Sequence, residues 1–544
     1  MFGWLQRFWQ GDVNAPQRGP LLHSQLPYFE FDERENSEFR QVHLLKDGSL
    51  GVCWKAHVPA SYAVDGGVES TINELRTFIE SIPDGFEVQL IITSTNNLDR
   101  KIERYINLPG DTDRGRHLRL ARAEKLLEAG RYGYAVSERG YTKLRDTYLL
   151  ITLRTPEQHE RLGILGHGLN ALYQLLAVLV GVVGLQPERI FGKFIQDILK
   201  TTLSEFREAL VSAESTLNRM FELERMSLAD LKEHYWTSLA PSYREAGQRV
   251  SVDPRQDFNA QVFPLPVEQQ FDVVRLGKDY HAVVMLAMMP DAIVHDYMGA
   301  LRRISPFGYT FFCNIAQANQ MLEKVGLTLS AALRNRVATM FSQEEAQIVN
   351  QEASQVRARM VGGRKIVYSQ IGMIVHGNSR AEVEERVLRM NSEFKKLSIV
   401  PDIEKAMCLQ AMSYAWPLVW RNRYTRPFAR TRRVLSDDLC EMLPLHGHWM
   451  GHKMGMAVYV NRDNELTFFD HCHPEFVNWH YAITGTSGSG KSVMVVDLTL
   501  QLMASGIKKQ YLLTIKDDYD RFAQTLGKLI VIDLDRQDAC INPF

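Results

Sequence analysis

One eight-residue stretch near the end of this sequence has residue types and a spacing that suit phosphate chemistry. It fits the pattern G-x-x-x-x-G-K-[ST] at every fixed position and comprises Gly485, Thr486, Ser487, Gly488, Ser489, Gly490, Lys491 and Ser492. Glycines allow consecutive backbone N–H groups to turn toward a phosphate, and the lysine adds a positive charge beside the outer phosphates. The serine hydroxyl at the end of the pattern is a ligand for Mg²⁺. The sequence therefore predicts a P-loop that binds ATP and Mg²⁺.

The segments on either side of this stretch are predicted to hold it in place. Residues 479–483 form a short apolar run that is typical of a buried strand, and residues 493–503 form one that suits a buried helix. A helix that begins near Lys491 would direct its free N–H groups and the positive end of its dipole at the phosphates. The alternative is a flexible Gly/Ser loop, and the order of strand, loop and helix argues against it.

The residues after the loop predict the start of a motor domain. Residues 509–515 and 528–534 are predicted strands, and Asp517 and Asp518 follow the first of these, where we expect them to face the nucleotide. Hydrolysis also needs a second acidic residue for Mg²⁺ and a residue that positions water, yet no apolar strand ending in Asp-Glu follows the P-loop. We therefore expect the chain to be truncated within this domain, so ATP binding is better supported than ATP hydrolysis.

The fold predicted from the sequence is an α+β N-terminal region followed by the beginning of an α/β P-loop NTPase (RecA-like) domain. The divisions are an N-terminal arm, a mixed α/β domain, a proline-containing connector, a second mixed α/β unit and the incomplete P-loop NTPase domain. In that order they cover residues 1–25, 26–238, 239–265, 266–440 and 441–544. The two mixed units have similar strand and helix content, but no residue-level repeat is strong enough to indicate a duplication.

Local periodicity predicts the elements of the two mixed units. Strands alternate around a turn at residues 46–48, and a second hairpin surrounds a turn at residues 277–279. The charged stretch 97–131 suits exposed helices. Further strands are expected at 86–92, 147–153, 309–315 and 365–375, and helices at 70–82, 190–226, 292–304, 329–360 and 380–396.

Composition and charge indicate a cellular compartment but do not identify a class of binding partner. The net charge of −1 gives no global attraction to nucleic acid or to an anionic membrane, so any such attraction must come from local patches. The six cysteines form no C-x-x-C pair, which is typical of reduced, structural thiols in a reducing compartment.

Two segments raise the question of membrane contact. Residues 1–9 are rich in large apolar side chains, which could lie in a lipid interface or pack as a short arm on their own domain or a neighbour. Residues 162–187 carry no charged side chain and are long enough to span a bilayer. Their polar residues and glycines favour the alternative of a buried helix in a globular domain.

Two further clusters have weaker chemical signals. The arginines between Trp420 and Val434 are interspersed with aromatic residues, which suits nucleic-acid or phosphate binding, or else a loop that forms salt bridges; they are Arg421, Arg423, Arg426, Arg430, Arg432 and Arg433. Histidines and a cysteine gather at His446, His448, His452, His471, Cys472 and His473. Their spacing does not match a structural zinc site, so a metal is not expected there.

Together with the P-loop, several short segments make this chain resemble the conjugative type IV secretion ATPases, and the F-type, TraC-like branch fits best. The resemblance spans most of the chain, but only the P-loop is specific. The other segments are Leu26-Pro27-Tyr28, Asp47-Gly48-Ser49-Leu50-Gly51, Ile82-Pro83-Asp84-Gly85-Phe86 and Asn542-Pro543-Phe544.

The resemblance implies an ATP-binding motor subunit that supports pilus assembly and the transfer of DNA and protein. It implies a cytoplasmic homo-oligomer, such as a hexamer, at the inner membrane of a bacterium, with other channel subunits as partners. It also implies that Lys491 holds the outer phosphates and Ser492 the magnesium. Two alternatives stay open, a DNA-pumping translocase with a related core and a truncated docking subunit without turnover.

Overall fold

The computed structural model contains two compact units. The first comprises Met1–Asn97, Tyr134–Met450 and Asn461–Glu465, and the second comprises Leu98–Gly133, Gly451–Val460 and Leu466–Phe544. The structure describes Tyr519 and residues 26–507, except for 36, 57–65, 109–112, 136–140, 157–186, 244–249, 263–265, 289–306, 338–350, 352–353, 426–429, 448, 450, 453–454 and 475.

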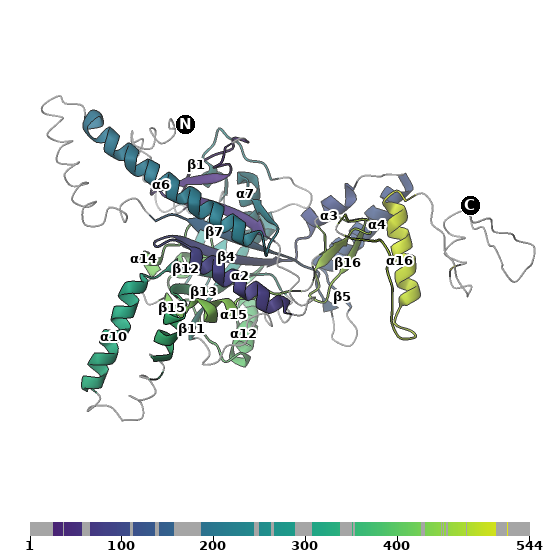
Figure 1. The fold of residues 1–544 in the computed structure, drawn as a ribbon. Helices are drawn as coiled ribbons and strands as arrows, with labels where there is room; N and C mark the ends of the chain where they lie inside the picture. Colours follow the sequence, from purple (N-terminus) through teal and green to yellow (C-terminus); the bar gives the residue numbers. More distant parts are fainter. Residues whose placement is uncertain are drawn as a thin grey trace, which may run out of the picture. The chain divides into compact units, whose positions relative to one another are not determined.

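The first unit is built on one large antiparallel sheet (Figure 1). Across the sheet, its main strands are β1 (Tyr28–Phe31), β2 (Val42–Leu45), β3 (Leu50–Ala56), β7 (Asp146–Arg154), β4 (Glu87–Thr95), β12 (Tyr309–Gln317), β13 (Ile366–Gly377), β11 (Asp279–Met288), β10 (Val274–Leu276) and β9 (Val267–Gln269). Three short strands pair beside this path, β8 (Leu223–Arg225), β14 (Val400–Ile403) and β15 (Arg432–Leu435). The fold is thus mixed α/β, as the sequence predicts, and one sheet contains strands from both predicted mixed segments.

The strand order reveals a topological repeat. The first half runs β2-β3-β7-β4 across the sheet, and the second runs β10-β11-β13-β12. In each half, the first two strands along the chain are neighbours, and the fourth strand lies between the second and the third. The two third strands, β4 and β12, pair antiparallel at the centre, with Gln89 opposite Asn314. This repeat is not visible in the residues themselves, because strand order depends on long-range pairing.

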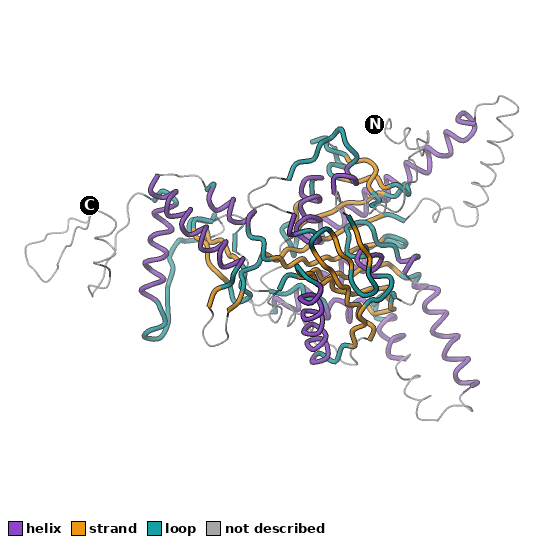
Figure 2. The backbone as a smooth tube through the Cα atoms, turned by 180° about the vertical axis from the view of Figure 1, so that it is seen from behind, coloured by secondary structure: helices purple, strands orange, loops and turns teal. Residues whose placement is uncertain are grey.

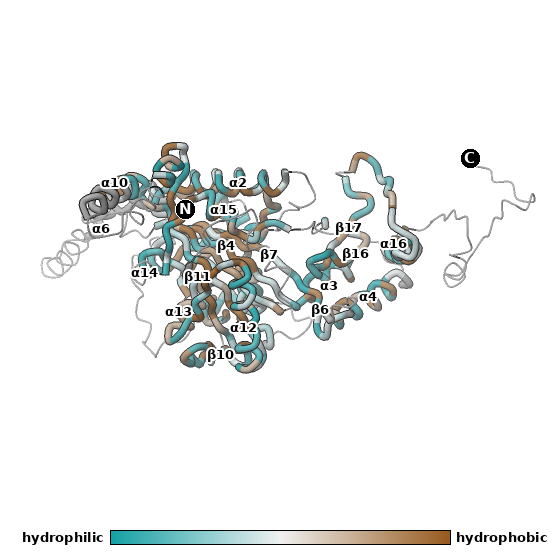
Figure 3. The backbone as a smooth tube through the Cα atoms, turned by 90° about the horizontal axis from the view of Figure 1, so that it is seen from below, coloured by the Kyte–Doolittle hydropathy of each residue, from teal (hydrophilic) through white to brown (hydrophobic). Residues whose placement is uncertain are grey.

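Helices cover both faces of the sheet (Figures 1 and 2). One apolar cluster joins one face of the sheet to α2 (Gly67–Ser81), α6 (Pro187–Leu217), α12 (Arg380–Lys396) and α15 (Ser436–Met442). A second cluster joins the other face to α7 (Leu228–Leu239), α8 (Phe258–Val262) and α13 (Cys408–Ser413). Because both faces are buried, the central strands contain continuous apolar runs, which appear brown at β4 and β11 in Figure 3.

Most local predictions in this unit are confirmed. The turn at Gly48 has a φ of 76°, which glycine adopts without steric cost, and it joins β2 to β3 as expected. Helix α12 spans the predicted residues, because Ser379 caps it by accepting a hydrogen bond from the Glu382 N–H group. The described cysteines are free, as expected, and all but Cys472 are buried.

Some boundaries in this unit differ from the prediction. The helix predicted at 190–226 ends at Leu217, where the chain turns into β8. The helix predicted at 329–360 begins earlier, as α10 (Gln320–Val337), and is helical again at 354–361. The helix predicted at 292–304 lies outside the described residues. The remaining short elements are β5 (Tyr134–Ala135), β6 (Tyr141–Thr142), the 3₁₀ turn η4 (Pro241–Tyr243) and α14 (Asn422–Thr425).

The second unit combines segments that are far apart in the sequence. Helices α3 (Asp99–Ile106) and α4 (Asp113–Arg131) come from the chain between β4 and β7. The hairpin of β16 (Ala457–Val460) and β17 (Leu466–Phe469) precedes α16 (Lys491–Ala504), which packs against α4 and β16. These elements position the predicted P-loop.

Both segments that raised the question of membrane contact, 1–9 and 162–187, lie outside the described residues, except for Pro187 at the start of α6. Within the part of the chain that the structure describes, no helix is long and apolar enough to cross a bilayer.

Candidate nucleotide-binding loop

The predicted P-loop forms a tight turn that leads directly into a helix. The N–H group of Ser489 donates to the Thr486 carbonyl at 3.2 Å, and Gly488 and Gly490 have φ values of 78° and 90°. Both values are in the region that favours glycine, so the backbone path favours glycine at Gly490, a fixed position of the pattern, and at Gly488, a variable one.

Helix α16 begins at Lys491, where the sequence predicts it. Its first intrahelical hydrogen bond runs from the Met494 N–H group to the Gly490 carbonyl, at 2.9 Å. The N–H groups of residues 491–493 therefore have no acceptor within the helix and point toward its N-terminal end. This is the arrangement in which a helix terminus binds phosphate, through free N–H groups and the helix dipole.

The side chain of Lys491 lies back across the loop. Its Nζ atom donates to the carbonyl oxygens of Gly485 and Thr486, each at 2.7 Å. A Cβ atom on Gly485 would lie 2.5 Å from the Ser489 hydroxyl, so glycine suits the close packing of the loop. Residues 485–490 and Ser492 are exposed and Lys491 is partly exposed, so the loop is open to a ligand.

The segment before the loop corrects one prediction. Residues 479–483 have no regular secondary structure, and Trp479, Tyr481 and Ile483 are 60%, 44% and 40% exposed. The buried strand predicted here is therefore wrong for the described residues, because an apolar run becomes a strand only where neighbouring strands pair with it. The two strands predicted after the helix, at 509–515 and 528–534, lie outside the described residues, as do Asp517 and Asp518.

The burial predicted for α16 is also wrong, although its helical conformation is confirmed. Val493 is 72% exposed, and the buried residues of the helix are Thr499, Gln501 and Ala504.

A polar network that the sequence reasoning missed fixes the middle of α16. Arg122 of α4 forms a salt bridge with Asp497 of α16, and Gln501 donates to the same carboxylate at 2.8 Å. Asp497 is the single charged residue in the apolar run 493–503, and Gln501 lies one helical turn after it. A single carboxylate in an apolar run predicts that its side chain has a specific polar partner, because charged residues are seldom buried unless they are paired.

Histidines and aromatic residues hold the chain that leads into the loop. The rings of His452 and His473 stack at 4.1 Å, and the Nδ1 atom of His452 accepts a hydrogen bond from the Asp470 N–H group at 2.9 Å. The Tyr481 hydroxyl donates to the His471 carbonyl at 2.5 Å, and burial lowers the pKa of His471. In this second unit, the described part of the chain has no set of histidine, cysteine and acidic side chains that could hold a metal.

The other predicted histidines lie elsewhere. His446 is buried in the first unit, and His448 lies outside the described residues.

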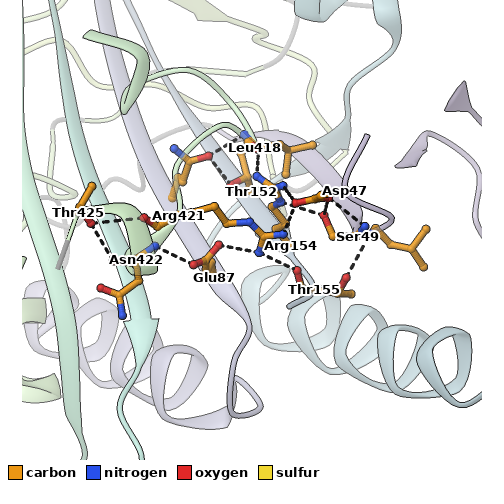
Figure 4. Close-up of polar contacts among 12 residues, drawn as sticks. Asp47, Ser49, Glu87, Thr152, Arg154, Thr155, Leu418, Arg421, Asn422 and Thr425 are labelled. Carbon is orange, nitrogen blue, oxygen red and sulfur yellow. Dashed lines mark hydrogen bonds and ion pairs between the residues drawn. The ribbon is translucent and has the colours of Figure 1, made fainter. Parts of the chain in front are cut away.

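The arginine cluster belongs to the first unit, where three of its described members form salt bridges. Arg421 is buried and binds Glu87 at 3.0 Å and Asp47 at 2.6 Å (Figure 4). Arg430 pairs with Glu404, and Arg433 pairs with Glu323 at 3.1 Å.

For these three arginines the salt-bridging alternative is the one observed, because each is paired with a carboxylate; the side chain of Arg433 nevertheless remains 65% exposed. Arg423 and Arg432 are exposed, and Arg426 lies outside the described residues.

The network around Arg421 fastens residues 414–422 to the sheet. Figure 4 shows Arg154 beside Arg421, where both contact Asp47. Burial by itself raises the pKa of Asp47, but the two guanidinium groups outweigh it and hold that pKa well below its usual value. Burial raises the pKa of Glu87 against the opposing effect of the same arginines. The cluster is therefore a structural ion network.

A row of amide side chains extends this attachment across the sheet. The Nε2 group of Gln89 donates to the carbonyls of Tyr414 and Trp416, at 3.0 and 3.2 Å, and its Oε1 atom accepts from the Leu418 N–H group. Asn314, opposite Gln89 on β12, donates to the same Tyr414 carbonyl. Backbone groups of residues 414–418 thus find their partners in side chains of the two central strands.

Comparison with known proteins assigns neither a family nor a function to this chain. No model of a protein family matches the chain, and a search of curated proteins finds no match.

Proposed function

We propose that this chain is an ATP-binding motor subunit of a conjugative type IV secretion machine, in which Gly485–Ser492 binds the phosphates of Mg²⁺·ATP. The observation that carries the nucleotide-binding part is the junction of loop and helix. Two glycines with positive φ turn the backbone into the N-terminus of α16, with Lys491 across the loop and Ser492 in the first helical turn.

The start of α16, Lys491 and Ser492 each have a defined task in this proposal. The free N–H groups at the start of α16 bind the β-phosphate, and Lys491 leaves the carbonyls of Gly485 and Thr486 to bind the outer phosphates. Ser492 would hold Mg²⁺ through its hydroxyl, and the bound ion would supply positive charge that neutralises the phosphates. Asp517 and Asp518 are proposed to face the nucleotide from beyond α16.

The wider assignment rests on the resemblance in sequence. It includes a RecA-like fold for the nucleotide-binding domain, a cytoplasmic location at the bacterial inner membrane, a homo-oligomeric state and other channel subunits as partners. The salt bridges of Arg421, Arg430 and Arg433 favour this assignment over a DNA-pumping translocase, because three arginines of the cluster that pointed to DNA are paired with carboxylates.

Binding of fluorescent methylanthraniloyl-ATP to the purified full chain, with and without Mg²⁺, tests the proposal. We expect saturable binding that unlabelled ATP displaces and adenosine does not, since the phosphates provide the contacts. Lys491→Ala should abolish binding, whereas Lys125→Ala, which removes an exposed lysine from α4, should leave it unchanged. Absence of binding by the unaltered chain, or equal binding by the Lys491 variant, would refute the proposal.

Turnover separates the remaining alternatives. Hydrolysis of ATP that requires Lys491 would exclude the non-hydrolysing docking subunit. Stimulation of that hydrolysis by DNA would favour the translocase instead.

A further inference from the structure

We infer that Arg122 is a positioning residue for the nucleotide site, acting through Asp497 on the helix that carries Lys491 and Ser492. This inference rests on the proposed function and concerns only contacts within the second unit. It assigns a role in nucleotide binding to a residue more than 300 positions before the P-loop in the sequence.

The first step is the distance along the helix. Asp497 lies six residues after Lys491, which corresponds to about 9 Å of helix at a rise of about 1.5 Å per residue. A tilt or rotation of α16 at Asp497 therefore moves the N–H groups and the lysine at its start. Phosphate binding depends on the direction of those groups, so whatever holds Asp497 determines how well the terminus is aimed.

The second step is the geometry at Asp497. The guanidinium of Arg122 contacts both carboxylate oxygens, with Nη1 on Oδ1 and Nη2 on Oδ2 at 3.2 Å. A two-point contact of this kind fixes orientation as well as distance. Gln501 donates to Oδ2 at 2.8 Å and adds a third contact from the next turn of the helix.

The third step is that the side chains of this network also bind the backbone of strand β16. The Nη2 group of Arg122 donates to the carbonyl of Val458 on β16 at 2.9 Å, and the N–H group of Val458 donates to Gln501 at 2.7 Å. Both polar backbone groups of Val458 are thus bound by side chains that also hold Asp497. Arg122, Asp497, Gln501 and Val458 form a closed ring of hydrogen bonds that ties α16 to α4 and β16 together.

The exposure of the pair favours positioning over simple stabilisation. The side chains of Arg122 and Asp497 are 28% and 29% exposed, so solvent screens part of the Coulomb attraction within the pair. Its directional contacts are unaffected by that screening. The ring therefore constrains where α16 lies more than it determines whether the unit folds.

The experiment measures the Kd of Mg²⁺·ATP for full-length variants. We expect Arg122→Met and Asp497→Asn each to raise the Kd by about tenfold, which corresponds to about 1.4 kcal/mol. The double variant should be no weaker than the weaker single variant, because the two residues act through each other. Arg122→Lys should recover part of the affinity, since it keeps one donor but loses the two-point contact. Arg116→Met, which removes an exposed arginine from the same helix, is the matched control.

A second measurement uses the reciprocity of coupling. If Arg122 aims the nucleotide site, bound nucleotide must in turn stabilise the contact at Arg122. Saturating Mg²⁺·ATP should therefore slow amide hydrogen exchange in α4 around Arg122 in the unaltered chain, and should do so less in Arg122→Lys.

The outcomes separate this inference from the proposed function. Failure of the unaltered chain to bind nucleotide overturns both. Binding that requires Lys491 but is unchanged in the Arg122 and Asp497 variants overturns the inference alone. Additive effects in the double variant, accompanied by an equal loss of melting temperature without nucleotide, would show a merely structural role and would also overturn it.

Discussion

Three buried histidines should make the first unit sensitive to acid. His43, His234 and His281 lie on or beside the large sheet and are at most 4% exposed. Burial lowers their pKa values to about 3 for His43 and His234 and to about 4 for His281. The folded state therefore holds them neutral at pH values where an unfolded histidine, with a pKa of about 6.5, binds a proton.

The magnitude follows from this difference in pKa. Above about pH 6.5 both states are neutral and the stability is fully present; below it, the unfolded state gains protons that the fold excludes. At pH 5 protonation favours the unfolded state by about 2 kcal/mol for each histidine, or about 6 kcal/mol for the three. That is comparable with the entire stability of many domains, at about 5–15 kcal/mol.

Urea unfolding of the full chain at pH 7.5 and pH 5.0 measures this effect. Tryptophan fluorescence suits it, because Trp54, Trp416 and Trp420 are buried against the sheet. In His43→Phe, an aromatic ring still packs on Phe31, 4.6 Å away in the native protein, but the titrating group is gone. The difference in unfolding free energy between the two pH values should shrink by about 2 kcal/mol.

The control is His480→Gln, which changes an exposed histidine in the second unit. An unchanged pH dependence in His43→Phe, equal to that of the unaltered chain and of the control, would refute the reasoning.

Three further substitutions test other parts of the structure. Arg421→Met leaves Glu87 buried without its salt-bridge partner and should lower the unfolding free energy by about 3–5 kcal/mol in urea titrations, whereas a loss below about 1 kcal/mol would contradict the buried ion network. Gly490→Ala places a side chain at a φ of 90° and should abolish Mg²⁺·ATP binding, whereas Gly506→Ala, at a φ of 87° beyond the end of α16, should leave binding intact; equal binding by both would count against the loop geometry. Gly372→Ala on β13 would place a Cβ atom 2.5 Å from a neighbouring aromatic ring and should cost about 1–3 kcal/mol in thermal unfolding, and an unchanged melting temperature would argue against that close packing.

Local signals explain why many elements could be predicted from the sequence. The turn at Gly48 and the cap at Ser379 act over two to four residues, so the sequence contains the information for the β2–β3 hairpin and for α12. The glycines of the P-loop are equally local, and they place the start of α16 at Lys491.

Long-range contacts explain what could not be predicted. The pairing of β4 with β12 joins segments more than 200 residues apart, and the sequence of neither strand indicates which strand it pairs with. Arg122 and Asp497 are separated even further in the sequence, so the lone carboxylate in an apolar run signalled a partner without identifying it. The strand predicted at 479–483 failed for the same reason, because its apolar pattern does not reveal whether a neighbouring strand pairs with it.

The repeated strand order has a consequence for the edges of the sheet. One half alone would expose the edge of β4 or of β12, with a row of unpaired N–H and C=O groups that invites association. In this chain the antiparallel β4–β12 ladder pairs the two edges with each other. Each half therefore covers the edge strand that would make the other half prone to aggregation.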